Sequence, residues 1–221
     1  MNSLNRKLFR LLSSLAISTA LCVGMIFFRI YKTGSLMYGF YIWNLFLAWV
    51  PLLASIILGY PAEKKRKWFA ELFFFSVWIG FFPNAPYLIT DIGHLAQRPE
   101  MPFWFDVLLV VVAAWNGLML GFISLYEIQK FLSARISSIF SKLIIPVMLS
   151  ICSFGIYLGR FERWNTWDIL FQPIDFIQNI HTILFHPLRN FKIFELVFLL
   201  SVFLLSCYYV LISFMRLESK E

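Results

Sequence analysis

The sequence predicts an all-α fold, a polytopic membrane bundle of about six transmembrane helices with interfacial amphipathic helices on the outer side. Three observations lead to this fold class. First, 60% of the 221 residues are hydrophobic and only 14% are charged, whereas soluble domains carry about 25% charged residues. Second, the apolar residues gather in six runs that are long enough to cross a bilayer. Third, the basic residues lie in short segments between these runs.

The predicted spans form a single transmembrane domain over residues 1–221. Residues 11–28 follow a basic segment, but the run is too long for the apolar core of a secretory signal and has no small-x-small cleavage site. We therefore expect an uncleaved first span. The six spans are predicted at residues 8–29, 37–59, 68–82, 103–125, 143–159 and 191–214.

The orientation follows from the distribution of lysine and arginine. Twelve of the nineteen lie on the side of both termini, and seven, including Arg29 and Lys32, lie on the other side. Cytoplasmic loops carry the excess of basic residues. We therefore expect a protein of the cell membrane with both termini in the cytoplasm and the segments near 84–98 and 160–190 outside.

The composition also limits the partners. The net charge of +7 is typical of some nucleic-acid-binding proteins, but here the basic residues lie in membrane loops. We expect the lipid bilayer and other envelope membrane proteins as partners, and no nucleic acid. Cys22, Cys152 and Cys207 each lie inside an apolar run, which indicates buried thiols and no disulfide framework, metal site or cofactor.

A first polar cluster follows the third run. Pro83 fits poorly inside a helix, so the third span is predicted to end near Phe82. Asn84 is then expected to cap a new amphipathic helix on the membrane surface, with Pro86 in its first turn. At about 100° per residue, four polar side chains fall on one stripe of this helix: Tyr87, Asp91, His94 and Arg98.

Two interpretations of this stripe remain open. In the first, which is the more common arrangement, Asp91 pairs locally with His94 or Tyr87 on a solvated face. In the second, the stripe is a site in which His94 is a general base or metal ligand and Asp91 orients it. Asn84 and Tyr87 would then contact the substrate.

A second polar cluster, RFERWNTWD, covers residues 160–168. Its tryptophans suit the headgroup layer, and Asn165 or Thr166 is expected to cap a following helix with Asp168 in its first turn. Another amphipathic helix is expected after Pro173. In the functional interpretation, this cluster supplies substrate contacts that meet Asp91 and His94 above the bundle: Arg160, Arg163, Asn165 and Asp168.

Some polar residues lie within or near the spans. Asn44 and Asn116 are expected to form hydrogen bonds between helices. Asp106 lies about one turn into the fourth span, where an ionisable residue is a candidate site member. Glu195 lies similarly in the sixth span, and we expect it to reach the interface.

Three segments together resemble a bacterial membrane family called domain of unknown function 1361: FPNAPYLITDIGHL (82–95), WNG with the following LMLGFISLY (115–126), and GIYLGRFERWNTWD (155–168). The similarity covers nearly the whole chain and implies a multi-spanning architecture without an assigned activity. Glu162 stands where the family is expected to have an apolar residue, which disfavours Glu162 as a catalytic acid. The resemblance points to these motif positions: Asn84, Pro86, Tyr87, Asp91, His94, Trp115, Gly159, Arg160, Arg163, Trp164, Asn165, Trp167 and Asp168.

Three functions are compatible with these observations. The one we favour is a non-enzymatic component of the cell envelope, structural or accessory, with a polar outer face. The alternative is an outer-leaflet enzyme for a lipid or lipid-linked substrate, in which Asp91 and His94 are catalytic and Arg160 or Arg163 holds a phosphate or oxyanion. Its weakness is the lack of an HExxH motif, a Gly-rich phosphate loop or a serine nucleophile motif. The third is a small transporter.

Overall fold

The computed structural model describes residues 3–59 and 67–218, and all regular structure in these ranges is helical. Most of the basic segment at 64–67 lies outside the described residues. The described part contains six stretches long and apolar enough to cross a membrane: Leu8–Thr33, Phe40–Gly59, Trp68–Gly93, Phe103–Ser133, Ile139–Arg160 and Phe191–Met215. These stretches confirm the all-α polytopic bundle and its six spans.

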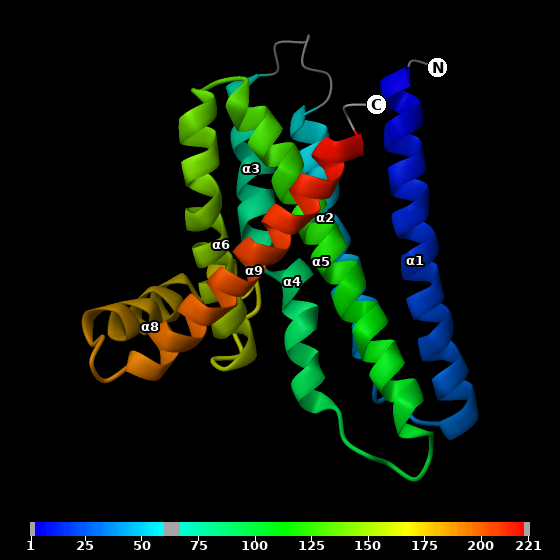
Figure 1. Cartoon of the computed structure of the whole chain (residues 1–221). Coiled ribbons are helices and arrows are strands. Elements are labelled where there is room, and N and C mark those ends of the chain that lie inside the picture. The colour runs from blue at the N-terminus through cyan, green and yellow to red at the C-terminus, as the bar shows by residue number, and fades with distance from the viewer. Residues whose placement is uncertain (1–2, 60–66, 219–221) are drawn as a thin grey trace. The chain divides into compact units, whose positions relative to one another are not determined.

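The chain forms two compact units, Met1–Ser124 and Leu125–Glu221, and α5 contributes to both. The expectation of a single domain stays a prediction. The helices, shown in Figure 1, are α1 (Ser3–Thr33), α2 (Phe40–Gly59), α3 (Trp68–Phe81), α4 (Asn84–Tyr87), the 3-10 helix η1 (Leu88–His94), α5 (Phe103–Ser133), α6 (Ser138–Arg160), α7 (Asp168–Phe171), α8 (Pro173–Phe185) and α9 (Phe191–Glu218).

Glycine ends the first helix. Gly34 has a φ of 67°, a left-handed conformation that glycine adopts without a steric penalty. Its N–H donates to the carbonyl of Ile30 at 2.8 Å, which satisfies one of the last carbonyls of α1. The chain then turns through residues 34–39 into α2.

Hydrogen bonds between spans hold the first unit together at mid-depth. Trp49 Nε1 donates to Thr19 Oγ1 at 3.2 Å, and the Thr19 hydroxyl lies 3.3 Å from Asn116 Oδ1. Asn116 Nδ2 also donates to the carbonyl of Ser18 at 3.3 Å. These bonds join α1, α2 and α5, and α1 and α5 lie side by side in Figure 1. The expected interhelical role of Asn116 is confirmed.

The α4 segment packs closely on α5. A Cβ atom on Gly117 would collide with the carbonyl oxygen of Ala85 and lie 2.7 Å from Leu88 Cδ1. One turn later, a Cβ on Gly121 would lie 3.2 Å from Pro86 Cδ. The two glycines therefore allow the α4 backbone to approach α5, as small residues do between membrane helices.

The prolines end the helix where the sequence predicts: α3 stops at Phe81, and Phe82 is its C-cap. Helical turns resume at Asn84, with Tyr87 N–H bonded to Pro83 O at 3.0 Å, so the membrane-length stretch as a whole extends from Trp68 to Gly93. Asn84 is not an N-cap. Its side chain donates backwards to the carbonyl of Phe81 at 3.2 Å and bridges α3 to α4.

In the second unit, α6 packs along α9. Ser137 caps α6 by accepting the N–H of Phe140 at 3.4 Å. Only residues 134–137 separate α5 from α6, so the polar connector expected over 127–142 is mostly helical. Tyr208 of α9 donates to Gln129 Oε1 of α5 at 2.7 Å.

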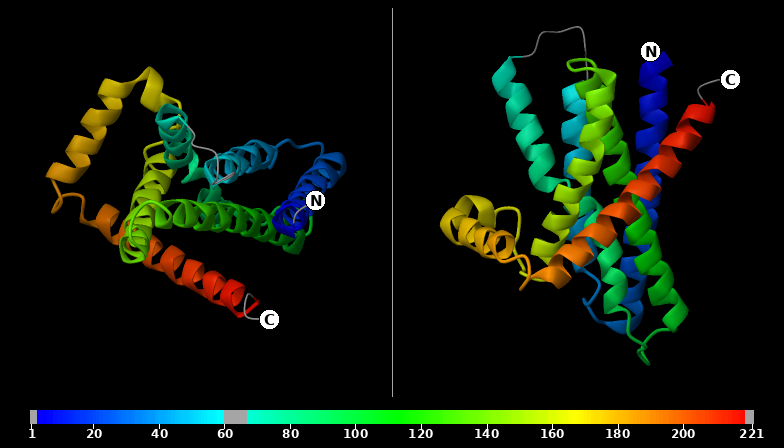
Figure 2. Two further views of the ribbon diagram at one scale, coloured as in Figure 1. Left: turned by 90° about the horizontal axis from the view of Figure 1, so that it is seen from above. Right: turned by 60° about the vertical axis from the view of Figure 1, so that its left-hand side comes forward.

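The connection from α6 to α9 contains α7 and α8, as Figure 2 shows. Pro173 is the first residue of α8, where its missing N–H costs nothing. Ile183 is buried against Tyr157 and Leu158, whereas Ile174 and Ile177 are exposed. The amphipathic helix expected after Pro173 is therefore present as α8, and its placement at the membrane surface stays a prediction.

Replacing Gly117 with alanine is expected to destabilise the protein by about 1–3 kcal/mol, since the added methyl group overpacks the contact between α4 and α5. Gly24→Ala is the matched control, because a Cβ on Gly24 meets nothing within 4 Å. Thermal unfolding in detergent, followed by tryptophan fluorescence, measures both. Equal midpoints for the two variants would contradict the close packing.

Candidate functional site

The predicted stripe does not form one solvated face of a helix. Asp91 is buried, with 1% of its surface exposed, and Tyr87 is half-buried. His94 is the last residue of η1, and Arg98 lies beyond the helix. The prediction of an amphipathic surface helix is therefore wrong in two respects: the polar stripe is not on a solvated face, and the helix ends at His94, before Arg98.

The reason is the helix type. From Leu88 onward the chain is a 3-10 helix, which has three residues per turn, so Leu88 and Asp91 lie one above the other. Leu88 is fully buried against α5, and Asp91 follows it into the interior of the first unit. A buried carboxylate inside a membrane-length helix is a candidate functional residue. The catalytic roles of Asp91 and His94 stay predictions.

In the second cluster, Glu162 joins two elements of the second unit. It accepts a hydrogen bond from Tyr157 OH at 2.8 Å and one from Asn179 Nδ2 at 3.2 Å. Tyr157 lies in α6 and Asn179 in α8, so the carboxylate fastens α8 to the end of α6. Arg160 is the last residue of α6, and Arg163 has a positive φ of 61°.

The sequence predicted that Asn165 or Thr166 would cap a helix that begins near Asp168, but here Asp168 accepts hydrogen bonds from Asn165. Asp168 Oδ2 accepts from the backbone N–H of Asn165 at 2.6 Å and from its Nδ2 at 3.1 Å. Trp167 precedes α7, and no side chain caps that helix. The carboxylate therefore fixes the preceding turn, where the sequence indicated an N-cap at Asn165 or Thr166.

The residues predicted to form one pocket are divided between the units. Asn84, Tyr87, Asp91 and His94 belong to the first unit, and Arg160, Arg163, Asn165 and Asp168 belong to the second. Within the second unit the structure brings Asn165 and Asp168 into direct contact. A shared pocket of the two clusters stays a prediction.

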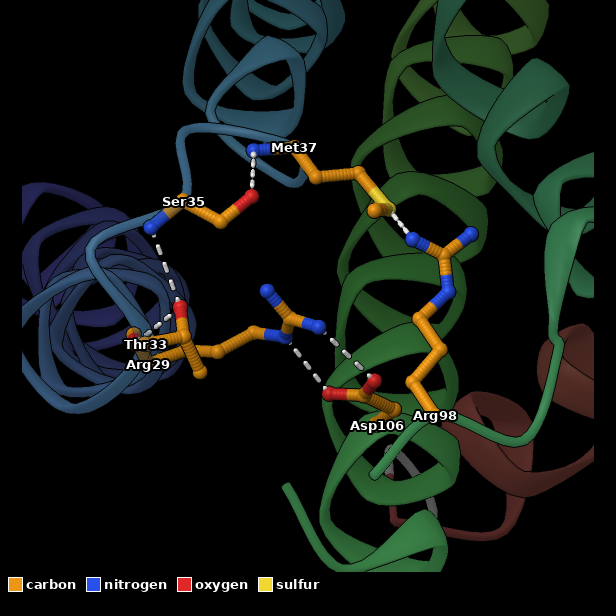
Figure 3. A network of polar contacts seen from close by, with 6 residues as sticks. All are labelled: Arg29, Thr33, Ser35, Met37, Arg98 and Asp106. Carbon is orange, nitrogen blue, oxygen red and sulfur yellow. Dashed lines mark hydrogen bonds and ion pairs between the residues drawn. The ribbon is translucent and has the colours of Figure 1, made fainter. Parts of the chain in front are cut away.

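The first unit contains a buried ion pair. Arg29 Nε donates to Asp106 Oδ1 at 2.7 Å, and Arg29 Nη2 donates to Asp106 Oδ2 at 3.1 Å. Both side chains are buried, and Figure 3 shows the two parallel bonds. Arg29 lies one turn before the end of α1 and Asp106 in the first turn of α5. The pair therefore joins these two helix ends by bidentate, charge-assisted bonds.

The turn between α1 and α2 covers this ion pair. The ring of Tyr38 lies 4.4 Å from the guanidinium carbon of Arg29 and stacks on Tyr41 at 5.9 Å. Burial raises the pKa of Tyr38, and the charge of Asp106 raises this pKa further. The phenol is therefore neutral at physiological pH and can donate a hydrogen bond.

Two donors of this cluster are not used within the described part of the chain. Arg29 Nη1 and the Tyr38 hydroxyl are both buried, and neither has a hydrogen-bond partner there. A buried donor without a partner costs about 1–3 kcal/mol. Arg98 contacts the sulfur of Met37 through Nη1, as Figure 3 also shows. We call these five residues, Arg29, Met37, Tyr38, Arg98 and Asp106, the Arg29 cluster.

Sequence reasoning identified Asp106 as a candidate but used Arg29 only for the orientation. The available signal was depth. Arg29 lies about one turn before the end of its span and Asp106 about one turn after the start of its own, so both are expected at the same side of the membrane. A buried charge requires an opposite partner. Tyr38 and Met37 carried no signal of their own. Among the described residues, no group of three or more His, Cys, Asp and Glu side chains is placed to hold a metal ion.

Removing one partner of the ion pair, as in Arg29→Met or Asp106→Leu, is expected to destabilise the protein by about 3–5 kcal/mol, because the other charge stays buried alone. The double variant is expected to cost less than either single variant. Thermal unfolding in detergent of all four proteins forms a double-mutant cycle.

The exposed pair Lys130 and Glu127, 3.0 Å apart on one helix, supplies the control. Lys130→Met and Glu127→Leu are each expected to change stability by less than about 1 kcal/mol. A double variant of Arg29 and Asp106 that loses as much stability as the two single losses together would show that the two charges are not coupled.

Residues 43–213 match the model of a family described as "Protein of unknown function (DUF1361)". The match covers α2 after its first turn, all of α3 to α8 and most of α9. No curated protein and no solved structure matches the chain significantly. Since the family model covers well over half of the chain, this protein, with its six membrane-length helices, belongs to the DUF1361 family of unknown function.

Proposed function

We propose that this multi-pass membrane protein is a non-catalytic component of the cell envelope, structural or accessory, with a polar outer face. One observation supports it above others, the internal use of carboxylates. Asp106 pairs with Arg29, Glu162 accepts from Tyr157 and Asn179, and Asp168 accepts from Asn165.

A catalytic carboxylate must reach a proton or an electrophilic atom of its substrate. Here the three carboxylates hold a helix end, a helix connection and a turn. Charge-assisted bonds of this kind are strong because the acceptor is ionised. Their use favours a rigid polar surface that other envelope proteins could contact over a reacting centre.

One observation keeps an enzyme as the second candidate. Asp91 is buried at 1% exposure and lies one 3-10 turn before His94, and a buried carboxylate is a frequent feature of functional sites. In this alternative the protein acts on a lipid or lipid-linked substrate at the outer leaflet, with Arg160 or Arg163 holding a phosphate.

Complementation of a deletion strain separates the two functions. We expect Asp91→Asn and His94→Gln, produced at the wild-type level, to restore the wild-type lipid profile and to co-purify the same membrane proteins. Both changes nearly preserve side-chain volume, so they test chemistry with little change in packing. If both variants accumulate normally but fail to restore the lipid profile, the protein is an enzyme and the first proposal is wrong.

The proposed placement is the cell membrane, with both termini in the cytoplasm. It predicts that a cysteine at position 97 reacts with a membrane-impermeant maleimide added to intact cells, whereas a cysteine at position 135 reacts only after lysis. Gln97 and Arg135 are both exposed, so accessibility within the protein is matched. The background replaces Cys22, Cys152 and Cys207 with alanine. The reverse labelling pattern would invert the orientation.

A further inference from the structure

We propose that the Arg29 cluster binds one phosphate group, through Arg29, Tyr38 and Arg98, where α1 ends and α5 begins. The proposal goes beyond the non-catalytic function argued above and does not depend on it. It assigns a ligand chemistry to residues that lie outside the three sequence segments that first pointed to the family.

The first argument is the surplus of donors. Arg29 Nη1 and the Tyr38 hydroxyl are buried and have no hydrogen-bond partner among residues 3–59 and 67–218. Arg29 is 0% exposed and Tyr38 is 2% exposed. Because Asp106 binds Nε and Nη2, the guanidinium is held in one orientation and its remaining nitrogen is directed by the ion pair.

The second argument is the position of a second guanidinium. Arg98 lies in the segment between η1 and α5, and the charges of both Arg29 and Arg98 act on Tyr38. Figure 3 shows the Arg98 guanidinium directed at Met37 and the Arg29 guanidinium directed at Asp106. The charge of Arg29 is balanced by Asp106, whereas Arg98 contacts a thioether sulfur, which is a weak acceptor. The remaining nitrogen of Arg29, the guanidinium fork of Arg98 and the phenol of Tyr38 match the several acceptor oxygens of a phosphate.

The third argument concerns access. Met37 is half-buried and lies against Arg98, and methionine is an adaptable apolar side chain. A phosphate oxygen would replace its sulfur at Arg98 when the side chain moves aside. The cluster lies near the ends of two spans, at the depth where arginine side chains reach lipid headgroups. A lipid phosphodiester and free phosphate are the two sources of this chemistry.

Two acidic side chains oppose the ligand. Asp106 is paired with Arg29 and its charge also acts on Tyr38, so its charge is largely balanced within the cluster. Glu100 is exposed and its charge acts on Arg29. It would compete with a phosphate for the same donors, so its removal is expected to strengthen binding. An increase in affinity for the probe when Glu100 is neutralised distinguishes a phosphate site from a purely internal contact.

The test measures thermal unfolding of the purified full-length protein in dodecyl maltoside, titrated separately with phosphatidylglycerol and with inorganic phosphate. We expect a saturable rise of the midpoint with one probe, which identifies the source. Arg98→Gln is expected to weaken the apparent affinity about tenfold or more, and Tyr38→Phe about three- to tenfold, the effects of a charge-assisted and a neutral hydrogen bond. Glu100→Gln is expected to tighten binding severalfold.

Matched controls use the same changes outside the cluster. Lys32→Gln removes one positive charge a few residues from Arg29, and Tyr31→Phe removes a hydroxyl from a ring that is 83% exposed. Both are expected to bind the probe as the wild type does. The proposal is overturned if neither probe raises the midpoint, or if Lys32→Gln weakens binding as much as Arg98→Gln. None of these variants removes Arg29 or Asp106, so the ion pair is preserved.

Discussion

The buried ion pair between Arg29 and Asp106 is the contact on which the arrangement of the first unit depends. In an apolar bundle, two opposite charges are stable only when they meet with good geometry, because each alone would need water or another charge. Here Nε and Nη2 face both carboxylate oxygens at 2.7 and 3.1 Å. The pair fixes the last turn of α1 against the first turn of α5, and the turn over residues 34–39 follows from that position.

The same requirement acts at other depths of α5. Asn116 joins this helix to α1 and, through Thr19, to Trp49 of α2. Two turns further along α5, Ser124 accepts from the buried indole of Trp78 of α3 at 3.2 Å. One polar side chain at each level therefore sets the register of a neighbouring helix, while apolar packing supplies most of the contact area. This division suits a bilayer, where apolar side chains alone distinguish poorly between protein and lipid.

The six apolar runs were enough to predict the number and type of the spans, because hydrocarbon thickness fixes the length of a crossing helix. The segment after Phe82 was predictable only in part. Its prolines indicated the break that ends α3 at Phe81 and the new helix that begins at Asn84. The stripe of polar residues assumed an α-helical period, whereas the 3-10 helix from Leu88 turns Asp91 inward. Residue types do not distinguish these two periods over only seven residues.

The candidate site at Arg29 and Asp106 was predictable only in part. The depth of each residue along its span can be counted in the sequence, but the adjacency of α1 and α5 cannot. The polar regions around Arg29 and around Glu162 also differ in their chemistry. Around Glu162, the carboxylate accepts from Tyr157 and Asn179 and fastens α8 to α6, and the buried atom left without a partner there is an acceptor, Asn179 Oδ1. Around Arg29, donors exceed acceptors within the described residues, and two of them are buried. An anionic ligand therefore gains new hydrogen bonds at the Arg29 cluster, whereas at Glu162 it would have to displace a carboxylate. The polar motif RFERWNTWD is thus used mainly to build the second unit. The residues suited to a ligand, Arg29, Tyr38 and Arg98, lie outside the three segments that resemble the family.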